Sequence, residues 1–273
     1  MSRLGHTGRV ATEVGTAEPG AAAREQRYGL ELLAVLGVSY GMSGIYALLS
    51  FIRDQIVINH GIGFSNVATG PIKHAEKSQY QWLDILDQVA GILAGVLPAF
   101  LAVVLLMRSP GGRGFGIGLD RLRLREIGQG AGFALLIGGP GLAFVYFARK
   151  LGANAQIVVT DFPDVWYRVP TLILEAFQQG VSEEVVVGAF VLTRLAQLGW
   201  TNQRALALGA VLRGSYHLYQ GYGGFVGNAI MGVIFGWWFQ RTRRVWPLII
   251  AHFVIDAVSF VGYVYLHNRV SWI

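Results

Sequence analysis

The chain is 273 residues long, and 53% of its residues are hydrophobic while only 14% are charged. A soluble domain carries about 25% charged residues, so this composition indicates a membrane protein. The chain has no cysteine, which excludes disulfides, thiolate metal sites and cysteine nucleophiles. The net charge is +6, but the basic residues lie between apolar blocks, as loop charges do, and we therefore expect no nucleic-acid partner.

A tail and a series of apolar segments make up the chain. Residues 1–28 are rich in Gly, Ala, Glu and Arg without an apolar run, which predicts a disordered cytoplasmic tail. Residues 29–273 hold segments close to the about 20 residues that cross a bilayer. These segments are 30–52, 82–107, 126–148, 169–198, 205–220, 225–240 and 245–266. The sequence predicts an all-α, polytopic transmembrane bundle of seven spans, or of eight if the long fourth segment breaks in two.

Loop charges predict how the bundle is oriented in its membrane. Five arginines lie within residues 108–125, and three more lie within 241–244 after the sixth span. Positively charged loops stay in the cytoplasm, and seven spans with a cytoplasmic N-terminus place both loops on that side. The segments 53–81 and 149–168 then face outward and are long enough to form caps over the bundle.

Ionisable residues are concentrated in the last four predicted spans. A charge at the centre of a membrane helix costs on the order of 3 kcal/mol, so several of them should face one another or a water-filled cavity. Helical spacing predicts three polar faces, formed by Glu175, Gln179 and Glu183, by Arg213, His217 and Gln220, and by His252, Asp256 and Ser259. Glu184 lies about 100° around the helix from Glu183 and can border the same cavity.

Carboxylates beside two imidazoles permit two hydrolytic schemes. They can bind a divalent metal such as Zn²⁺ and activate its water, with His217, His252, Glu184 and Asp256 as the ligands. Without a metal, a buried glutamate can act as general base on a water, assisted by His217, while His252 stabilises the oxyanion. No hydroxyl nucleophile with a neighbouring base stands out, which disfavours a serine mechanism.

Three strings of residues carry a resemblance to a known family. They are Val-Ser-Glu-Glu-Val-Val-Val-Gly with Glu183 and Glu184, Ser-Tyr-His-Leu-Tyr-Gln-Gly with His217, and Ala-His-Phe-Val-Ile-Asp with His252 and Asp256. They resemble the CPBP family of intramembrane proteases, which includes the CaaX prenyl proteases of the Rce type and the bacterial Abi proteins. The resemblance covers about residues 165–262.

The resemblance implies an intramembrane endopeptidase, with or without a metal, that cleaves a peptide or membrane-protein substrate in a bacterial plasma membrane. By the family motifs, Glu183 and Glu184 match the pair assigned to water activation, and His217 matches the histidine of the second motif. His252 and Asp256 match the motif assigned either to metal ligation or to an oxyanion pocket. Nothing in the sequence identifies a pocket for a prenyl group.

Two positions depart from the family pattern. The family has Arg four residues after the second Glu, where this chain has Gly188, and an aromatic residue four before the His, where it has Arg213. We predict that Arg213 is a supporting residue that supplies the missing guanidinium from a neighbouring helix and pairs with Glu183 or Glu184. The departures also favour an alternative, a non-catalytic membrane scaffold or bacteriocin-immunity protein of the same family.

A further alternative is a proton-coupled transporter, in which intramembrane Glu and His relay protons. No repeat relates the two halves of the chain, and the polar residues lie in the second half. This asymmetry argues against transport.

Overall fold

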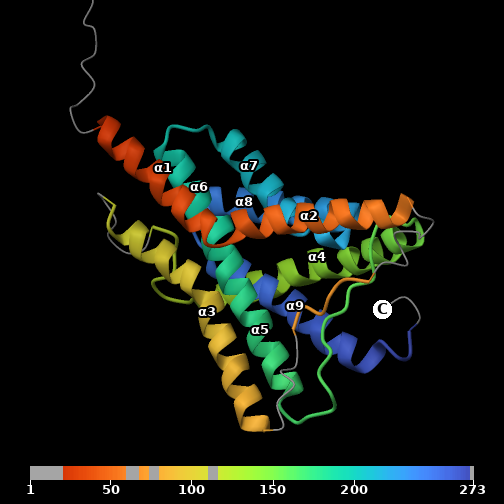
Figure 1. Cartoon of the computed structure of the whole chain (residues 1–273). Coiled ribbons are helices and arrows are strands. Elements are labelled where there is room, and N and C mark those ends of the chain that lie inside the picture. The colour runs from red at the N-terminus through yellow and green to blue at the C-terminus, as the bar shows by residue number, and fades with distance from the viewer. Residues whose placement is uncertain (1–20, 60–67, 74–79, 110–115, 271–273) are drawn as a thin grey trace, which may run out of the picture.

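The computed structural model describes residues 21–59, 68–73, 80–109 and 116–270, which form a bundle of helices (Figure 1). The α-helices are α1 (Ala21–Gly37), α2 (Tyr40–Asn59), α3 (Gln81–Met107), α4 (Leu124–Lys150), α5 (Arg168–Glu183), α6 (Leu192–Gln197), α7 (Asn202–Tyr216), α8 (Tyr222–Thr242) and α9 (Trp246–Leu266). A π-helix, η2 (Glu184–Val191), joins α5 to α6, and a 3-10 helix, η3 (Leu218–Gln220), follows α7. The prediction of an all-α bundle is confirmed.

From residue 81 onward the helices follow the predicted apolar segments closely. The N-terminal part differs, because the predicted span 30–52 forms the two helices α1 and α2, which meet at an angle of 48°. Helix α1 also begins at Ala21, inside the segment 1–28 predicted as a tail. Its Tyr28 ring lies 4.6 Å from the guanidinium of Arg194, a contact that holds this part of the helix against the bundle. Residues 1–20 lie outside the described residues.

In the described ranges, three helices are each long and apolar enough to cross a membrane, namely α3, α4 and α9. The bent pair α1 and α2 passes the same test when taken together and would make a fourth span. Helices α5 and α7, with 16 and 15 residues, are shorter than the 18 residues that a candidate span requires. The chain is an integral membrane protein, while the count of seven spans and the cytoplasmic N-terminus stay predictions.

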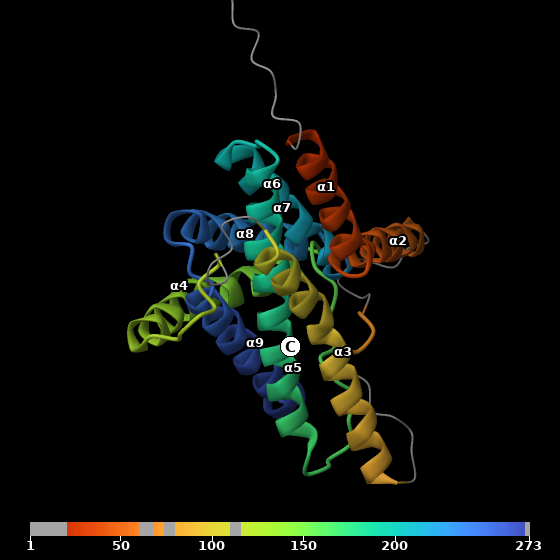
Figure 2. The same ribbon diagram turned by 90° about the vertical axis from the view of Figure 1, so that its left-hand side faces the viewer.

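Helix α5 lies at the centre of the bundle, with α3 and α9 against it (Figures 1 and 2). Helix α4 packs on α9, and α7 packs on α2 and α8. Glycines permit the closest approaches: a Cβ at Gly180 on α5 would lie 3.1 Å from the Ile249 carbonyl oxygen on α9. Small residues at such crossings let membrane helices approach backbone to backbone. The polar residues of α5, α7 and α9 are therefore held at short range.

Contacts at the two ends of the bundle fix the loops. At one end, Thr69 N–H donates to Gln156 O at 2.8 Å and Lys73 N–H donates to Val159 O at 3.0 Å, so parts of the two predicted caps pair with each other. At the other end, Arg244 bonds Asp120 in the loop before α4, and this bond holds the pKa of the Asp120 carboxyl below its ordinary range. The polar site lies between these two ends.

Candidate active site

The predicted site residues of α5, η2, α7 and α9 converge in the interior of the bundle. Arg213 reaches in from α7, and its Nη1 donates to Glu184 Oε1 at 2.7 Å. Its Nη2 lies 3.4 Å from Glu183 Oε2. The predicted pairing is confirmed, and it includes both glutamates. The side chains of Arg213 and Glu184 are 1% and 0% exposed, so this ion pair is fully removed from solvent.

His252 extends the ion pair onto α9. Its Nδ1 lies 2.8 Å from Glu184 Oε1 and 3.0 Å from Arg213 Nη2. Its Nε2 lies 3.2 Å from the Asp256 carboxylate, one turn further along the same helix. Both ring nitrogens of His252 are therefore engaged by groups of the protein. Arg213, Glu184 and His252 are called the buried triad below.

Glu183 has a second set of contacts on the other side of Arg213. The Tyr216 hydroxyl donates to Glu183 Oε2 at 2.8 Å, and His217 Nε2 lies 3.7 Å from the same oxygen. The Gln220 amide nitrogen lies 3.4 Å from His217 Nδ1, and because that amide is a donor, the ring proton of a neutral His217 belongs on Nε2. His217 Nε2 has no hydrogen-bond partner among the described residues.

Exposure divides the site into two layers. The side chains of the buried triad are at most 3% exposed. His217 and Asp256 are 16% and 19% exposed, and Glu183, at 7%, lies between the layers. Buried charged groups are tolerated when they are paired, as those of the triad are. The part of the site that a reactant could approach is thus the side with His217 and Asp256.

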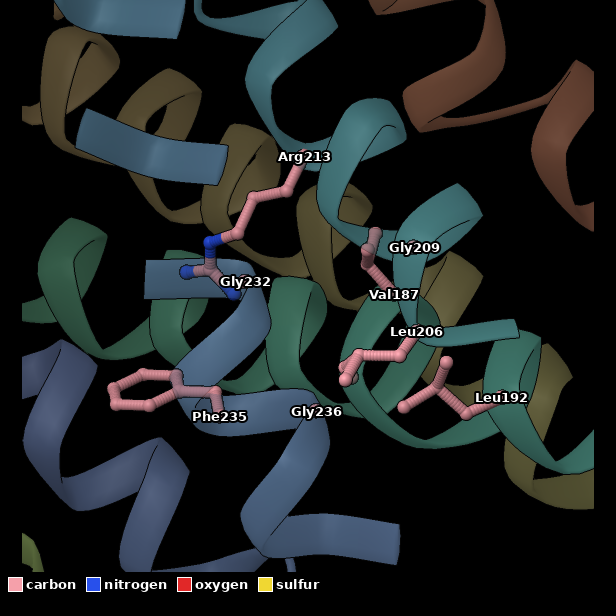
Figure 3. A pocket seen from close by; sticks show the side chains of 9 residues that line it. Val187, Leu192, Leu206, Gly209, Arg213, Gly232, Phe235 and Gly236 are labelled. Atoms are coloured by element: carbon pink, nitrogen blue, oxygen red, sulfur yellow. The ribbon is translucent and has the colours of Figure 1, made fainter. Parts of the chain in front are cut away.

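Glycines make room for Arg213. A Cβ at Gly232 on α8 would lie 3.2 Å from Arg213 Cδ, and a Cβ at Gly188 on η2 would lie 2.9 Å from Glu184 Oε2. Next to them is a small cavity of about 10 Å³ between η2, α7 and α8 (Figure 3). Its walls are formed by Val187, Gly188, Leu192, Leu206, Gly209, Arg213, Gly232, Phe235 and Gly236. Gly188 and Arg213, the two departures from the family pattern, thus meet at one place.

The four residues predicted as metal ligands do not fit a metal ion in this arrangement. Among the described residues, no three His, Asp or Glu side chains are grouped so that they could hold one. Arg213 already occupies the space between Glu183 Oε2, Glu184 Oε1 and His252 Nδ1. Asp256 faces the other nitrogen of His252, and His217 lies beside Glu183.

Three members of the predicted polar faces, Glu175, Gln179 and Ser259, lie apart from this cluster. Glu175 pairs with Lys73 of the loop before α3 at 2.9 Å, and it accepts a hydrogen bond from Gln179. Ser259 is exposed, and its hydroxyl donates to the Ile255 carbonyl within its own helix. The polar faces of α5 and α9 therefore extend beyond the site. On α5 the polar face reaches the end of the bundle where Lys73 lies.

Tyr216 is a site residue that the sequence analysis missed. It lies three residues after Arg213, on the same face of α7, so helical spacing could have found it. Its ring packs against Tyr40 of α2, with the ring centroids 4.7 Å apart. The N-terminal helices thus support the position of Glu183, although they carry none of the predicted site residues.

The fold and the site together define a class of protein. This chain is a polytopic membrane protein whose helices enclose a polar site of glutamate, histidine and arginine. Residues 165–258 match the family of type II CAAX prenyl endopeptidases described as Rce1-like. This match confirms the resemblance to the CPBP proteases over these residues. All six predicted site residues lie within the matched range. No curated protein and no solved structure matches the chain.

Proposed function

We propose that this protein is an intramembrane endopeptidase that hydrolyses a peptide bond beside Glu183 and His217. The observation that carries this proposal is the difference between the two glutamates. Glu184 is 0% exposed, and its Oε1 is bonded by Arg213 and lies beside His252. Glu183 adjoins the more exposed His217, whose Nε2 has no other partner among the described residues.

In the proposed reaction Glu183 removes a proton from a water molecule as the water oxygen attacks the peptide carbonyl carbon. The carbonyl π electrons move onto its oxygen, and His217 Nε2–H donates a hydrogen bond to this oxyanion. When the tetrahedral intermediate collapses, the C–N bond breaks and Glu183 returns its proton to the leaving nitrogen. The products are an amine and a carboxylic acid, and Glu183 is again a carboxylate.

The neighbouring residues have positioning roles in this scheme. The Tyr216 hydroxyl holds the Glu183 carboxylate through its hydrogen bond of 2.8 Å. Arg213 pairs with both glutamates and offsets one of their two negative charges. Both ring nitrogens of His252 are already engaged, which favours a role in orienting the triad over the direct oxyanion role suggested by the sequence. Asp256 accepts from His252 and orients it in turn.

The test is cleavage of a fluorogenic peptide library, prenylated CaaX peptides included, by the detergent-purified full-length protein. Glu183→Gln and His217→Ala should each lower turnover by about 10²–10⁴-fold, the range of a general acid–base group. The matched control is Glu175→Gln, which changes another buried glutamate of α5 that pairs with Lys73 instead, and it should keep wild-type turnover. Full activity in Glu183→Gln would contradict the assigned role.

The second candidate is a non-catalytic membrane protein of the same family, such as a scaffold or an immunity protein. The observation that favours it is the neutralisation of Glu184 by Arg213 in a fully enclosed ion pair. In that case the wild-type protein cleaves no peptide, and Glu183→Gln changes stability but no catalytic property. The same peptide library therefore separates the two candidates.

A further inference from the structure

Arg213 lies where acidic and imidazole groups from three helical segments converge. Glu184 Oε1 is 2.7 Å from its Nη1, while His252 Nδ1 and Glu183 Oε2 are 3.0 Å and 3.4 Å from its Nη2. Carboxylate oxygens and imidazole nitrogens are the atoms that bind Zn²⁺ in proteins. A divalent ion bound by these same atoms would have to take the place that the guanidinium has.

The charges at this point require a cation. Glu183, Glu184 and Asp256 bring three carboxylates into one cluster, and a buried charge without a counter-ion is costly. Arg213 supplies a positive charge that does not depend on pH, because a guanidinium stays protonated in proteins. Unlike a metal ion, this cation is covalently attached and cannot exchange with solvent.

The residues that surround Arg213 in space leave room for its long side chain. Gly232 leaves room beside its Cδ, and Gly188 leaves the space next to Glu184 free of a side chain. Phe235 lies beneath the guanidinium, 5.5 Å from its central carbon, at cation–π distance. Arg213 is therefore positioned by packing against Phe235 as well as by its ion pairs.

We infer that the Arg213 guanidinium is the resident cation of this site, where it positions Glu184 and His252 in place of a metal ion and excludes divalent ions. The consequence of this inference for catalysis rests on the proposed peptidase function. With Arg213 in place of a metal ion, the proposed peptidase reaction needs no metal. Arg213 is a positioning residue in this scheme, since it acts through the glutamates and His252. Metal binding can be measured whether or not the protein cleaves a peptide.

The first experiment measures Co²⁺ and Zn²⁺ bound to the purified full-length wild type after incubation and desalting, next to His252→Ala. We expect the two proteins to retain the same trace amount of metal. One ion per chain in the wild type that disappears in His252→Ala would overturn the inference.

The second experiment removes the guanidinium by Arg213→Ala. Glu184 Oε1 and His252 Nδ1 are already 2.8 Å apart, close to the about 3.3 Å between ligand atoms on a tetrahedral zinc ion. We expect the variant to bind Co²⁺ at least about tenfold more tightly than wild type, with the visible absorption of a Co²⁺ site. Adding His252→Ala should abolish this binding. A folded Arg213→Ala protein with wild-type Co²⁺ affinity would count against the inference.

The matched control is Arg194→Ala, which removes another fully buried guanidinium whose ion-pair partner is Glu31. It should gain no Co²⁺ affinity. If Arg213→Ala does not fold, Arg213→Lys decides: a folded lysine variant without bound Co²⁺ supports a required resident cation, and one that binds Co²⁺ contradicts it. A metal-free wild type without turnover on any peptide would defeat the proposed function and leave this inference intact.

Discussion

Arg194 and Arg213 are among the least exposed side chains of the described bundle, and their surroundings differ. Arg194 on α6 donates to the Ser109 hydroxyl, to the Leu105 carbonyl oxygen, to the Gln197 side chain and to the Glu31 carboxylate. Arg213 on α7 meets two carboxylates and an imidazole within 3.4 Å. One arginine is surrounded mainly by neutral acceptors, and the other by acids.

The comparison separates a buried charge that holds helices together from one that organises a site. Around Arg194 there is one carboxylate, Glu31, which also pairs with Arg27, and the contacts join α1, α3 and α6. Around Arg213 the carboxylates outnumber the guanidinium, so one of them, Glu183, remains available beside His217. An excess of acids around a buried arginine therefore marks a candidate site more clearly than a buried arginine alone does.

The largest expected effect is that of Arg213→Met on stability. This change leaves Glu184 buried without its ion-pair partner, and breaking a buried pair costs about 3–5 kcal/mol. Arg194→Met should cost less, about 1–3 kcal/mol, because Glu31 keeps Arg27 at 2.8 Å and is 10% exposed. Unfolding by denaturing detergent in mixed micelles measures both free energies. Equal losses would remove the distinction between the two arginines.

A smaller effect is expected where Gly188 faces the glutamate of the buried triad. Gly188→Ala places a Cβ 2.9 Å from Glu184 Oε2 and forces the carboxylate to move, at a cost of about 1–3 kcal/mol. The control Gly128→Ala on α4 meets nothing within 4 Å and should be neutral or stabilising. The same unfolding assay compares the two, and an unchanged stability of Gly188→Ala would show that the space around Glu184 is not tight.

Asp256 tests how much of the triad's order depends on charge. Asp256→Asn keeps a hydrogen-bonding group near His252 Nε2 but removes the carboxylate that now lies 3.2 Å away. Neutral hydrogen bonds are weaker than charged ones by about 1 kcal/mol, so turnover should fall about fivefold. The turnover of the Asp256→Ala variant should fall further than that of Asp256→Asn. Equal turnover in the Asn and Ala variants would exclude a role for this hydrogen bond.

The smallest effect concerns an ion pair at the end of the bundle, Arg244 with Asp120. Because Arg244 lowers the pKa of Asp120, the contact stabilises the folded protein above the ordinary aspartate pKa of about 4. The contribution is lost as the pH falls through the lowered pKa. Melting temperatures of wild type and Asp120→Asn should therefore differ slightly at neutral pH and converge in acid. A pH-independent difference would contradict this account, and added salt should weaken the effect at neutral pH.

Much of this arrangement could be predicted from local patterns in the sequence. Long apolar runs predicted the bounds of α3, α4, α8 and α9 to within three residues, because a membrane span needs an unbroken stretch of apolar side chains. Spacing of three and four residues placed Arg213, His217, His252 and Asp256 on inward faces, since the cost of charge in a membrane leaves few other positions for them. The pairing of Arg213 with the glutamates was predicted from the family resemblance, because Gly188 stands where the family has an arginine.

The remainder depends on contacts between distant segments. Residues 38–39, where the helix breaks between α1 and α2, include no Pro from which the break could be predicted. Helix α1 is positioned by the contacts of Tyr28 and Glu31 with Arg194. The sequence also could not predict which of the two adjacent glutamates contacts His252. Glu183 and Glu184 are the same residue type, and they differ only in the neighbours that the fold brings to them. Periodicity shows which face is polar, but not which group on it meets which.

The π-helix Glu184–Val191 links the two arginine clusters through the geometry of the backbone. It starts at the glutamate that meets Arg213 and ends three residues before Arg194. A π turn takes up more residues than an α turn, so this segment sets the rotational phase between the two positions. Loss of one residue would let this segment close as a regular α-helix, whereas a further inserted residue would rotate Arg194 by about 100° about the helix axis, away from Ser109. An insertion in this segment should therefore disturb the contacts of Arg194 without any change to the residues that make them.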